Sequence, residues 1–333
     1  MLSVPIARVE SLIIDALCCE GVSRDNASSV ARALVAAEID GQAGHGLSRV
    51  NSYLAQAKSG KVSGDAIPEI RQTADAIVSI DAGFGFAYPA IETAITELKK
   101  LAPVKGIAAA SLFHSHHAGQ LCQHVEALAD AGLVALMFAN TPHAIAPWGG
   151  DKSVFGTNPI AFAAPRQDKP SLVIDLSLSK VARGKVMKAA QRGEPIPDDW
   201  ALDAEGNPTT DPVAALGGTM LPMGEAKGSA LALMVEILAA VLTGANLSAE
   251  ASSFFDAKGA PPGVGQLIIA ISPEAFGHTN FTDRLEQLLA MIEEQQGTRL
   301  PGSKRVAQRS LTNNGTLEIG EEAFNTLKDR INT

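Results

Sequence analysis

The spacing of apolar residues changes near residue 76, and this change constrains the fold more than any other feature of the sequence. The first sixty residues carry apolar side chains at helical spacing, as in Val9, Leu12, Ile13, Ala16 and Leu17. From Ala76 onward, short apolar runs of strand length alternate with helical segments. The sequence therefore predicts a mainly helical region followed by an α/β region.

Individual elements follow from the same patterns. Strands are predicted at 77–80, 107–113, 133–138, 159–164, 172–178 and 266–271. Helices are predicted at 90–98, 121–131, 225–242, 281–295 and 320–331. Residues 193–212, rich in Gly, Pro and Asp, read as an excursion from the main body. The order of strands and helices between 77 and 138 indicates a βαβ-type unit.

Composition excludes several classes of protein. The net charge of −9 argues against a general nucleic-acid binder, which would present a basic face. The three cysteines have no Cys-x-x-Cys spacing, so neither a disulfide framework nor a thiolate zinc site is indicated. The N-terminus lacks the apolar stretch of a signal peptide. The most apolar stretch, Gly228 to Gly244, is short for a membrane span and contains Glu236, so we predict a buried helix there and a cytoplasmic protein.

The sequence offers only a partial Rossmann motif. Gly83 and Gly85 match the first two glycines of Gly-x-Gly-x-x-Gly, but the third glycine is absent. The acidic residue expected about 20 positions further on is absent as well. We interpret Asp81 to Tyr88 as a tight turn. A Rossmann site is not predicted.

The densest polar cluster is His114-Ser115-His116-His117-Ala118-Gly119. It lies between a predicted strand and the N-terminus of a predicted helix, where free backbone N–H groups favour an anion such as pyrophosphate. Ala118 and Gly119 would let a ligand approach the backbone closely. Two alternatives remain open: a capping loop with solvated histidines, and a zinc site of His114, His116 and His117.

A second candidate is Gly44-His45-Gly46, a histidine between two glycines at a predicted helix break. Arg49 follows one helical turn later, on about the same face. An arginine can hold a substrate carboxylate through two parallel hydrogen bonds, and a histidine can supply a proton. A structural histidine between helices is the alternative.

Taken in order, several segments resemble the malate/L-lactate dehydrogenase family, whose fold is unrelated to that of Rossmann dehydrogenases. The family includes ureidoglycolate and sulfolactate dehydrogenases and Δ1-piperideine-2-carboxylate/Δ1-pyrroline-2-carboxylate reductase. The segments that carry the resemblance cover nearly the whole chain: Gly44 to Arg49, His114 to Gly119, Pro147 to Gly150, Phe155 to Phe162, Ile174 to Ser177, Ala182 to Lys185, and Leu300 to Gly302.

This resemblance implies a non-Rossmann NAD(P)-binding α/β domain, residues 71–274, beside a helical domain of residues 1–70 joined by the C-terminal helices 275–333. It implies a homodimer that binds NAD or NADP and a small carboxylated substrate, with no nucleic-acid or membrane partner. It makes His45 and His117 the catalytic residues and Arg49 the substrate ligand. The implied cofactor-binding residues are His117, Ala118, Gly119, Gln120, Leu121, Thr157, Asp175, Leu176, Ser177, Lys227, Arg299 and Pro301.

Two positions depart from the family pattern. The family usually has Ser before the catalytic histidine, where this chain has Gly44, and the Asp of the relay proposed for cyclic-imine reductases aligns with Lys185. We therefore expect proton donation to rest on His45 with water. We also expect that Arg299, Lys304 and Arg305 could meet the 2′-phosphate of NADP.

The function expected is hydride transfer between NAD(P)H and C2 of a 2-keto or 2-hydroxy acid, or of a cyclic 2-imino acid. This hypothesis needs no bound metal. The alternatives are a zinc-dependent hydrolase that uses His114, His116 and His117, and a non-catalytic ligand-binding homologue.

Overall fold

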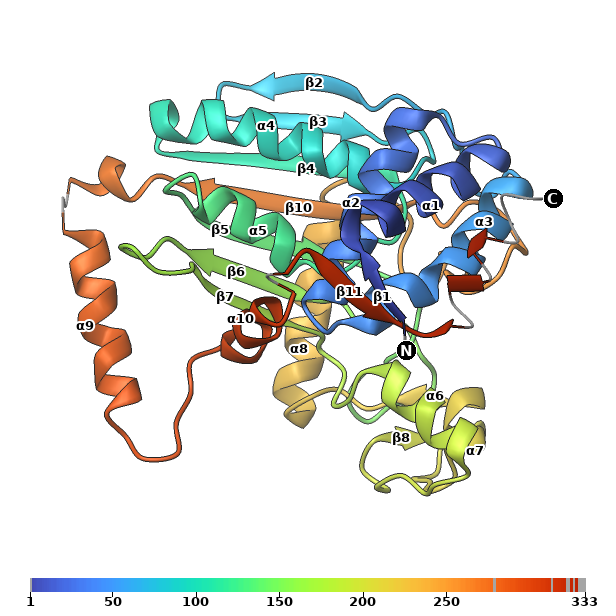
Figure 1. Ribbon diagram of the computed structural model, residues 1–333. Coiled ribbons are helices and arrows are strands. Elements are labelled where there is room, and N and C mark those ends of the chain that lie inside the picture. Colours follow the sequence, from blue (N-terminus) through green and yellow to red (C-terminus); the bar gives the residue numbers. More distant parts are fainter. Residues whose placement is uncertain (1, 278–279, 313, 322–323, 326, 329–333) are drawn as a thin grey trace.

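The computed structural model describes residues 2–277, 280–312, 314–321, 324–325 and 327–328. A seven-stranded sheet lies at its centre, with helices packed against it and a helical N-terminal part beside it (Figure 1). The sheet order is β2-β3-β4-β10-β5-β6-β7. Its strands are β2 (Glu69–Ala74), β3 (Ile77–Asp81), β4 (Ile107–Ser115), β10 (Val264–Ile271), β5 (Val134–Ala139), β6 (Ile160–Ala164) and β7 (Leu172–Leu176). The α/β class predicted from the sequence is confirmed.

Only one pair of neighbouring strands in this sheet, β3 and β4, is parallel. The helix α4 (Ala87–Lys105) connects these two strands, which confirms the predicted βαβ unit. β10 inserts between β4 and β5 and pairs with both in antiparallel fashion. The sheet therefore differs from the parallel sheet of a Rossmann fold. The edge strand β2 was not predicted, because all six of its residues are exposed and it lacks an apolar face.

The predicted Asp81 to Tyr88 turn is confirmed and leads from β3 into α4. Gly83 and Phe84 both have positive φ, and the carboxylate of Asp81 accepts the backbone N–H of Gly83 at 2.8 Å. Beyond it, α4 and α5 (Cys122–Ala129) cover one face of the sheet. Ile91, Leu98 and Val125 pack there against strand residues such as Leu112.

The N-terminal part consists of helices with a break before the third. They are α1 (Ile6–Cys19), α2 (Arg24–Ile39), the 3-10 turns η1 (Ala43–His45) and η2 (Leu47–Arg49), and α3 (Val50–Lys58). Ser23 caps α2, because its hydroxyl accepts the N–H of Asn26 at 3.4 Å. β1 (Leu2–Pro5) pairs with β11 (Thr316–Ile319), so the end of the chain returns to this region.

The prediction of a buried helix between Gly228 and Gly244 is confirmed only in part. α8 (Glu225–Glu236) continues into the π-helical segment η3 (Ile237–Val241), and only one side packs on the sheet, through residues such as Val235 and Ala239. Leu233, Ile237 and Val241 are 49%, 47% and 60% exposed. The sequence is apolar around the whole helix, but within one chain only one side has something to pack against.

A small lobe lies below the sheet in Figure 1 and contains the predicted excursion. It holds α6 (Arg183–Arg192), β8 (Ala201–Leu202), α7 (Pro212–Gly217) and β9 (Thr219–Met220). β8 and β9 pair with each other. Val186, Ile196 and Ala215 give the lobe an apolar interior that is continuous with the core under α8.

The C-terminal segment contains η4 (Pro273–Phe276), α9 (Phe281–Glu293) and α10 (Ser303–Ser310). The predicted 281–295 helix is confirmed as α9, whereas α10 and β11 were not predicted. Glu286 of α9 binds Arg166 and Lys169, which lie between β6 and β7. The predicted 320–331 helix lies partly outside the described residues, of which 321, 324–325 and 327–328 are helical. None of the described helices is long and apolar enough to cross a membrane.

Candidate active site

His45 lies at the helix break that the sequence predicted, between η1 and η2. The carboxylate of Glu38 holds this break by accepting the backbone N–H of Leu47 at 2.6 Å. A Cβ on Gly46 would lie 2.4 Å from the Glu38 carboxylate oxygen, so a side chain there would displace that carboxylate. Gly44, by contrast, has open space around it. The local backbone thus sets His45 on an irregular segment next to the start of α3.

Arg49 lies one turn beyond His45, as predicted. Its Nε donates to the carbonyl of Gly44 at 2.7 Å, and its guanidinium lies 4.5 Å from the ring centre of Phe255. Its Nη1 is buried and has no hydrogen-bond partner among the described residues. Burial lowers the pKa of Arg49. A buried guanidinium with an unpaired donor is suited to bind an anion.

His117 meets His45 from the end of β4. Its Nε2 lies 3.2 Å from Nδ1 of His45, and the two ring planes differ by 11°. Its Nδ1 lies 2.6 Å from the hydroxyl of Tyr53, which lies 3.0 Å from the hydroxyl of Tyr88. The structure therefore joins the two histidines predicted to be catalytic, although they are 72 positions apart.

The loop of residues 253–258 packs beside His117. Lys61, whose side chain is 1% exposed, donates to three backbone carbonyls of this loop, those of Ser253, Asp256 and Lys258. Gln56 donates to the carbonyl of Phe254 at 2.9 Å. The ring of Phe254 packs 5.3 Å from that of His117, so these tethers place an apolar wall beside the imidazoles.

Burial controls the charge of the histidines. Desolvation, followed by repulsion from Arg49, lowers the pKa of His45 to about 4. Desolvation, followed by the charges of Lys61 and Arg49, lowers the pKa of His116 to about 3. Desolvation is also the main reason why the pKa of His117 lies well below its usual value. All three imidazoles are neutral at pH 7.

The geometry argues against the zinc alternative. His114 points to the carboxylate of Asp81 at 3.0 Å, His116 to Oε1 of Gln56 at 2.8 Å, and His117 to Tyr53 and His45. Within the described part of the chain, no three His, Cys, Asp or Glu side chains converge as a metal site would require.

The anion expected at the N-terminus of α5 is a carboxylate of the protein itself. Oδ2 of Asp175, at the end of β7, accepts the backbone N–H of Cys122 at 2.8 Å. One of the N–H groups predicted to bind pyrophosphate is therefore taken by Asp175, and pyrophosphate binding at this helix end stays a prediction. Desolvation raises the pKa of Asp175, against the opposing hydrogen bonds from Cys122 and Leu121.

Gln120, in the same loop, is tied to a buried ionic cluster. Its Nε2 donates to Asp40 at 2.9 Å, and its Oε1 is buried without a hydrogen-bond partner in the described part of the chain. Asp40 binds Arg309, which also binds Glu126 in α5. The cluster joins the end of α2 to α5 and α10, and through Asp40 it holds Gln120 of the loop that follows His117.

Gly119 has a structural constraint of its own. Its φ is +68°, and a Cβ there would lie 2.8 Å from the hydroxyl of Tyr88. A side chain at this position would therefore collide with Tyr88, and the approach of a ligand to the backbone stays a prediction. Ala118 is also buried, and its carbonyl lies 2.9 Å from Nε2 of His124.

Other residues predicted to bind the cofactor lie at the end of β7 and just after it. Leu178 donates its N–H to the carbonyl of Thr157 at 2.8 Å and accepts the N–H of Met223, just before α8. The hydroxyl of Ser177 lies 3.1 Å from that of Ser179. These contacts bring Leu176, Ser177 and Thr157 close to the start of α8, whose first turn carries the exposed Lys227.

The basic stretch near residue 300 only partly matches its expected role. A Cβ on Gly302 would lie 2.9 Å from the carbonyl of Val173, so this stretch runs along β7. Arg299 and Pro301 are exposed. Arg305 is 6% exposed and pairs with Glu126 at 2.9 Å, so the prediction that it could meet a 2′-phosphate is wrong.

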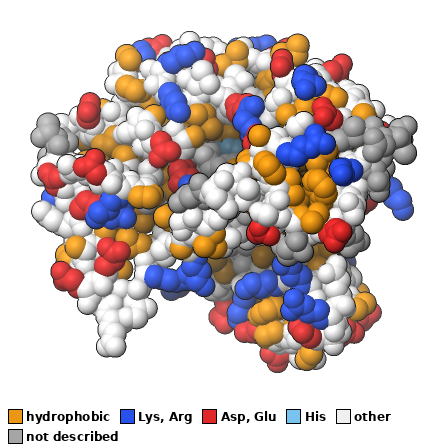
Figure 2. Space-filling model, in the orientation of Figure 1, with side chains coloured by type: hydrophobic (Ala, Val, Ile, Leu, Met, Phe, Trp, Pro, Cys, Tyr) orange, Lys and Arg blue, Asp and Glu red, His pale blue; other side chains and the backbone are white. Residues whose placement is uncertain are grey.

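The lobe that contains α6 and α7 has a basic surface. Figure 2 shows Lys and Arg side chains gathered where the lobe of α6 and α7 faces the main body. α6 carries Arg183, Lys185, Lys188 and Arg192. Lys185 is exposed and makes no hydrogen bond or ion pair with His45 among the described residues.

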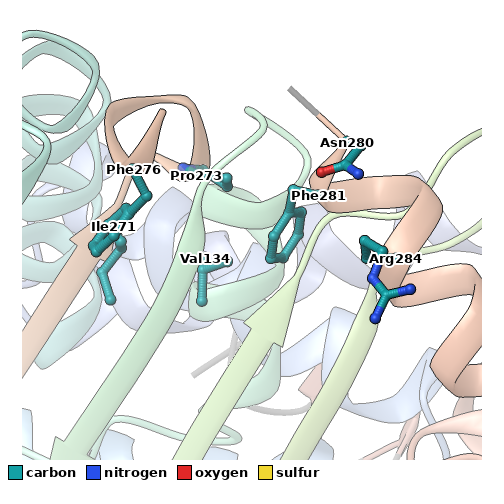
Figure 3. A pocket seen from close by; sticks show the side chains of 7 residues that line it. All are labelled: Val134, Ile271, Pro273, Phe276, Asn280, Phe281 and Arg284. Atoms are coloured by element: carbon teal, nitrogen blue, oxygen red, sulfur yellow. The ribbon is translucent and has the colours of Figure 1, made fainter. Parts of the chain in front are cut away.

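A separate pocket lies at the other end of the sheet (Figure 3). It measures about 530 Å³ and is lined by Val134, Ile271, Pro273, Phe276, Asn280, Phe281 and Arg284. Ile271 ends β10, whereas Val264, at the beginning of β10, pairs with Ser115 beside the histidines. The pocket is therefore about the length of a strand away and forms no part of the candidate site.

Sequence reasoning missed several residues of the site: Glu38, Gln56, Lys61, Tyr88, Phe254 and Phe255. Tyr53, a buried residue of α3, was not singled out either. Its spacing in that helix carries no sign of a hydrogen bond to His117, which comes from a distant strand. No local signal in the sequence distinguishes these residues from ordinary core or turn residues.

A mixed sheet without a dinucleotide-binding glycine motif, next to a neutral histidine and an arginine, agrees with an oxidoreductase of the non-Rossmann, nicotinamide-dependent class. The family model for malate/L-lactate dehydrogenase matches residues 4–328. The chain belongs to this family.

Curated relatives and solved structures agree with this assignment. The chain is 49% identical to a (2R)-3-sulfolactate dehydrogenase (NADP(+)) of Chromohalobacter salexigens, over 98% of this chain and 97% of that one. It is 39% identical to a Δ1-pyrroline-2-carboxylate/Δ1-piperideine-2-carboxylate reductase of Pseudomonas putida, over 98% and 96%. The structure of Δ1-piperideine-2-carboxylate reductase from Pseudomonas syringae pvar. tomato superposes with a TM-score of 0.94 at 36% identity, covering 99% of this chain and 100% of that one.

Proposed function

We propose that this protein is an NADP-dependent dehydrogenase that acts at C2 of a 2-hydroxy acid with a second anionic group, of the 3-sulfolactate type, and reduces the matching 2-keto acid. The observation that carries this proposal is the 49% identity to the sulfolactate enzyme along almost the whole chain. The two departures from the cyclic-imine pattern agree with it. Gly44 stands in place of a serine, and Lys185 stands where an acid would serve the imine relay, so a cation replaces an anion.

Arg49 is proposed to bind the C1 carboxylate of the substrate. Its Nη1 is buried and unpaired, and the side chain is fixed through its Nε bond to Gly44. A carboxylate would satisfy that donor and offset the desolvated charge. The Lys and Arg side chains on the lobe favour a further anionic group on the ligand (Figure 2).

His45 is proposed to act on the C2 oxygen. Its Nδ1 faces His117, which leaves Nε2 free to contact the substrate. Charge grows on the C2 oxygen when C2 receives a hydride, and a donor at Nε2 stabilises that charge and supplies the proton. His117 contacts Nδ1 of His45, on the side of the ring opposite to the proposed substrate. We also propose that His117 faces the reacting carbon.

The cofactor residues are those predicted from the sequence, with changed roles for some. The bound nicotinamide cofactor supplies the hydride to C2 or accepts it. A carboxylate at Asp175 with hydroxyl groups at Thr157 and Ser177 is a donor and acceptor set suited to the nicotinamide ribose, whose hydroxyls are free in NADP as in NAD. Lys227, Arg299 and Lys304 are exposed cations available to the phosphates. The name of the 49% relative favours NADP.

A cyclic 2-imino acid reductase is the second candidate. The observation that favours it is the 0.94 TM-score to the piperideine-2-carboxylate enzyme. A substrate panel separates the two: kcat/KM with NADP⁺ and sulfolactate, malate and lactate, and with NADPH and Δ1-pyrroline-2-carboxylate. The first proposal predicts the highest kcat/KM for a dianionic 2-hydroxy acid. Highest kcat/KM for the imine would replace the first proposal by the second.

We further propose a cytoplasmic homodimer, with residues 1–70 and part of 275–333 forming a helical domain beside an α/β domain of 71–274. The apolar side of α8 and η3, with Leu233, Ile237 and Val241, is the surface that favours a second copy, because a monomer rarely exposes such a row. Free Cys18, Cys19 and Cys122 agree with a reducing compartment.

A further inference from the structure

Two tyrosines extend the pair of active-site histidines into a chain of four hydrogen-bonding groups. The hydroxyls of Tyr88 and Tyr53 lie 3.0 Å apart, the Tyr53 hydroxyl lies 2.6 Å from Nδ1 of His117, and Nε2 of His117 lies 3.2 Å from Nδ1 of His45. Tyr53, Tyr88 and His117 are 0%, 2% and 6% exposed. Water therefore cannot readily serve as a partner within the chain.

The four groups are neutral at pH 7. Burial raises the pKa of Tyr53 to about 12 and raises that of Tyr88 well above its usual value. Burial also lowers the pKa of His45 to about 4 and that of His117 well below its usual value. Each group then has one hydrogen to donate, and all hydrogens in the chain must point in the same direction.

Only one direction satisfies every buried donor. If Tyr88 donates to Tyr53, Tyr53 donates to His117 and His117 donates to His45, the last hydrogen is on Nε2 of His45, at the open end. In the opposite direction, the hydroxyl hydrogen of Tyr88 has no acceptor among the described residues. A buried donor without a partner is costly, so the first direction is favoured.

We infer that Tyr53 is a positioning residue that fixes the tautomers of His117 and His45, so that His45 presents Nε2–H to the C2 oxygen of the substrate. The inference rests on the proposed function for the identity of that oxygen. A neutral imidazole can stabilise charge on an oxygen through its N–H. Tyr53 acts only through the two histidines, and Tyr88 orients Tyr53.

The two tyrosines provide a matched pair of variants. Tyr53→Phe removes the donor to Nδ1 of His117, so the tautomers of both histidines are no longer fixed. Tyr88→Phe leaves the Tyr53 hydroxyl with His117 as its only partner among the described residues, so the direction of the chain is kept. Both variants remove one hydroxyl from the same apolar cluster, next to Phe86. A purely structural role predicts similar effects for both.

The first measurement needs no substrate. Two-bond ¹H–¹⁵N correlation spectra of protein labelled with ¹⁵N-histidine show which ring nitrogen carries the proton, and His45→Asn and His117→Asn assign the signals. We expect Nε2–H on both histidines in the wild type and in Tyr88→Phe, and a loss of this single tautomer in Tyr53→Phe. Nδ1–H on His45 in the wild type would overturn the inference, whatever the substrate proves to be.

The second measurement separates kcat from binding with NADPH and the best substrate of the panel. We expect kcat to fall about tenfold or more in Tyr53→Phe and less than about threefold in Tyr88→Phe, with cofactor Kd nearly unchanged in both. Equal losses of kcat in the two variants would overturn the positioning role. An inactive wild type with Nε2–H on His45 would refute the proposed substrates but support the tautomer assignment.

Discussion

Asp175 and Cys122 are 53 positions apart in the chain, yet the carboxylate of Asp175 accepts the first N–H of α5 at 2.8 Å. The contact joins the end of β7 to the loop that carries His117. It also changes how cofactor recognition is understood, because the helix end holds a carboxylate of the protein. Ribose hydroxyls can donate to this carboxylate, whereas a phosphate would be repelled by it.

Asp175→Asn should therefore weaken cofactor binding. Asn can still accept the N–H of Cys122, so the helix end keeps its partner, but the charged acceptor for the ribose is lost. We expect cofactor Kd to rise about tenfold, the value of one charged hydrogen bond. Fluorescence titration with NADPH measures it. Asp168→Asn, an exposed position on the same β6–β7 hairpin, is the control. Equal affinity in both variants would remove Asp175 from the cofactor site.

Arg49→Lys should raise the substrate KM about tenfold, and Arg49→Ala about a hundredfold, with smaller effects on kcat. Lysine keeps the charge but cannot form two parallel hydrogen bonds with a carboxylate. Initial rates over a range of substrate concentrations give both constants. Arg24→Lys, at a side chain that is 73% exposed, should leave KM unchanged. If Arg49→Ala retains the wild-type KM, the substrate carboxylate is bound elsewhere.

Acid should destabilise the protein well above the pKa of its carboxylates. His116 and His124 have native pKa values of about 3 and about 4, whereas histidine in an unfolded chain titrates near 6.5. Between about pH 6.5 and pH 4, the unfolded chain binds protons that the native state excludes. The free energy of unfolding should be highest above about pH 6.5. Between pH 6.5 and pH 4 it should fall as the pH falls, by about 1 kcal/mol per pH unit for each such histidine.

Urea unfolding between pH 7.5 and pH 4.5 measures this slope. His124→Gln removes one titrating group but keeps a donor for the carbonyl of Ala118. Its slope should be smaller by the share of one histidine. An identical slope in the variant and the wild type would show that His124 is not held neutral in the native state.

Ile237→Glu together with Val241→Glu should convert the proposed dimer to a monomer. Both positions lie on the exposed apolar side of η3, where two carboxylates cannot be buried without partners. Sedimentation velocity gives the mass in solution. Val213→Glu, an exposed apolar position on α7, is the matched control and should remain a dimer. A double variant that sediments like the wild type would place the interface elsewhere.

The sequence predicted those parts of the site that depend on local chemistry. Glycines on both sides of His45 indicated the helix break, and the strand–helix junction indicated the His117 loop. Contacts between distant segments could not be predicted. Arg305 looked like a free cation, but its partner Glu126 lies 179 positions away. The apolar α8 sequence likewise looked buried, because composition does not show which sides of a helix have neighbours.

The most direct test of the central claim is the rate of hydride transfer in His45→Ala. Single-turnover loss of NADPH absorbance with a saturating 2-keto acid measures the chemical step, and a parallel titration measures cofactor Kd. A general acid contributes about 10²–10⁴-fold, so this rate should fall by that factor while Kd stays within about threefold of the wild type. His143→Ala, an exposed histidine near Ser153, should behave like the wild type. A His45→Ala enzyme with the wild-type rate at neutral pH would contradict the account.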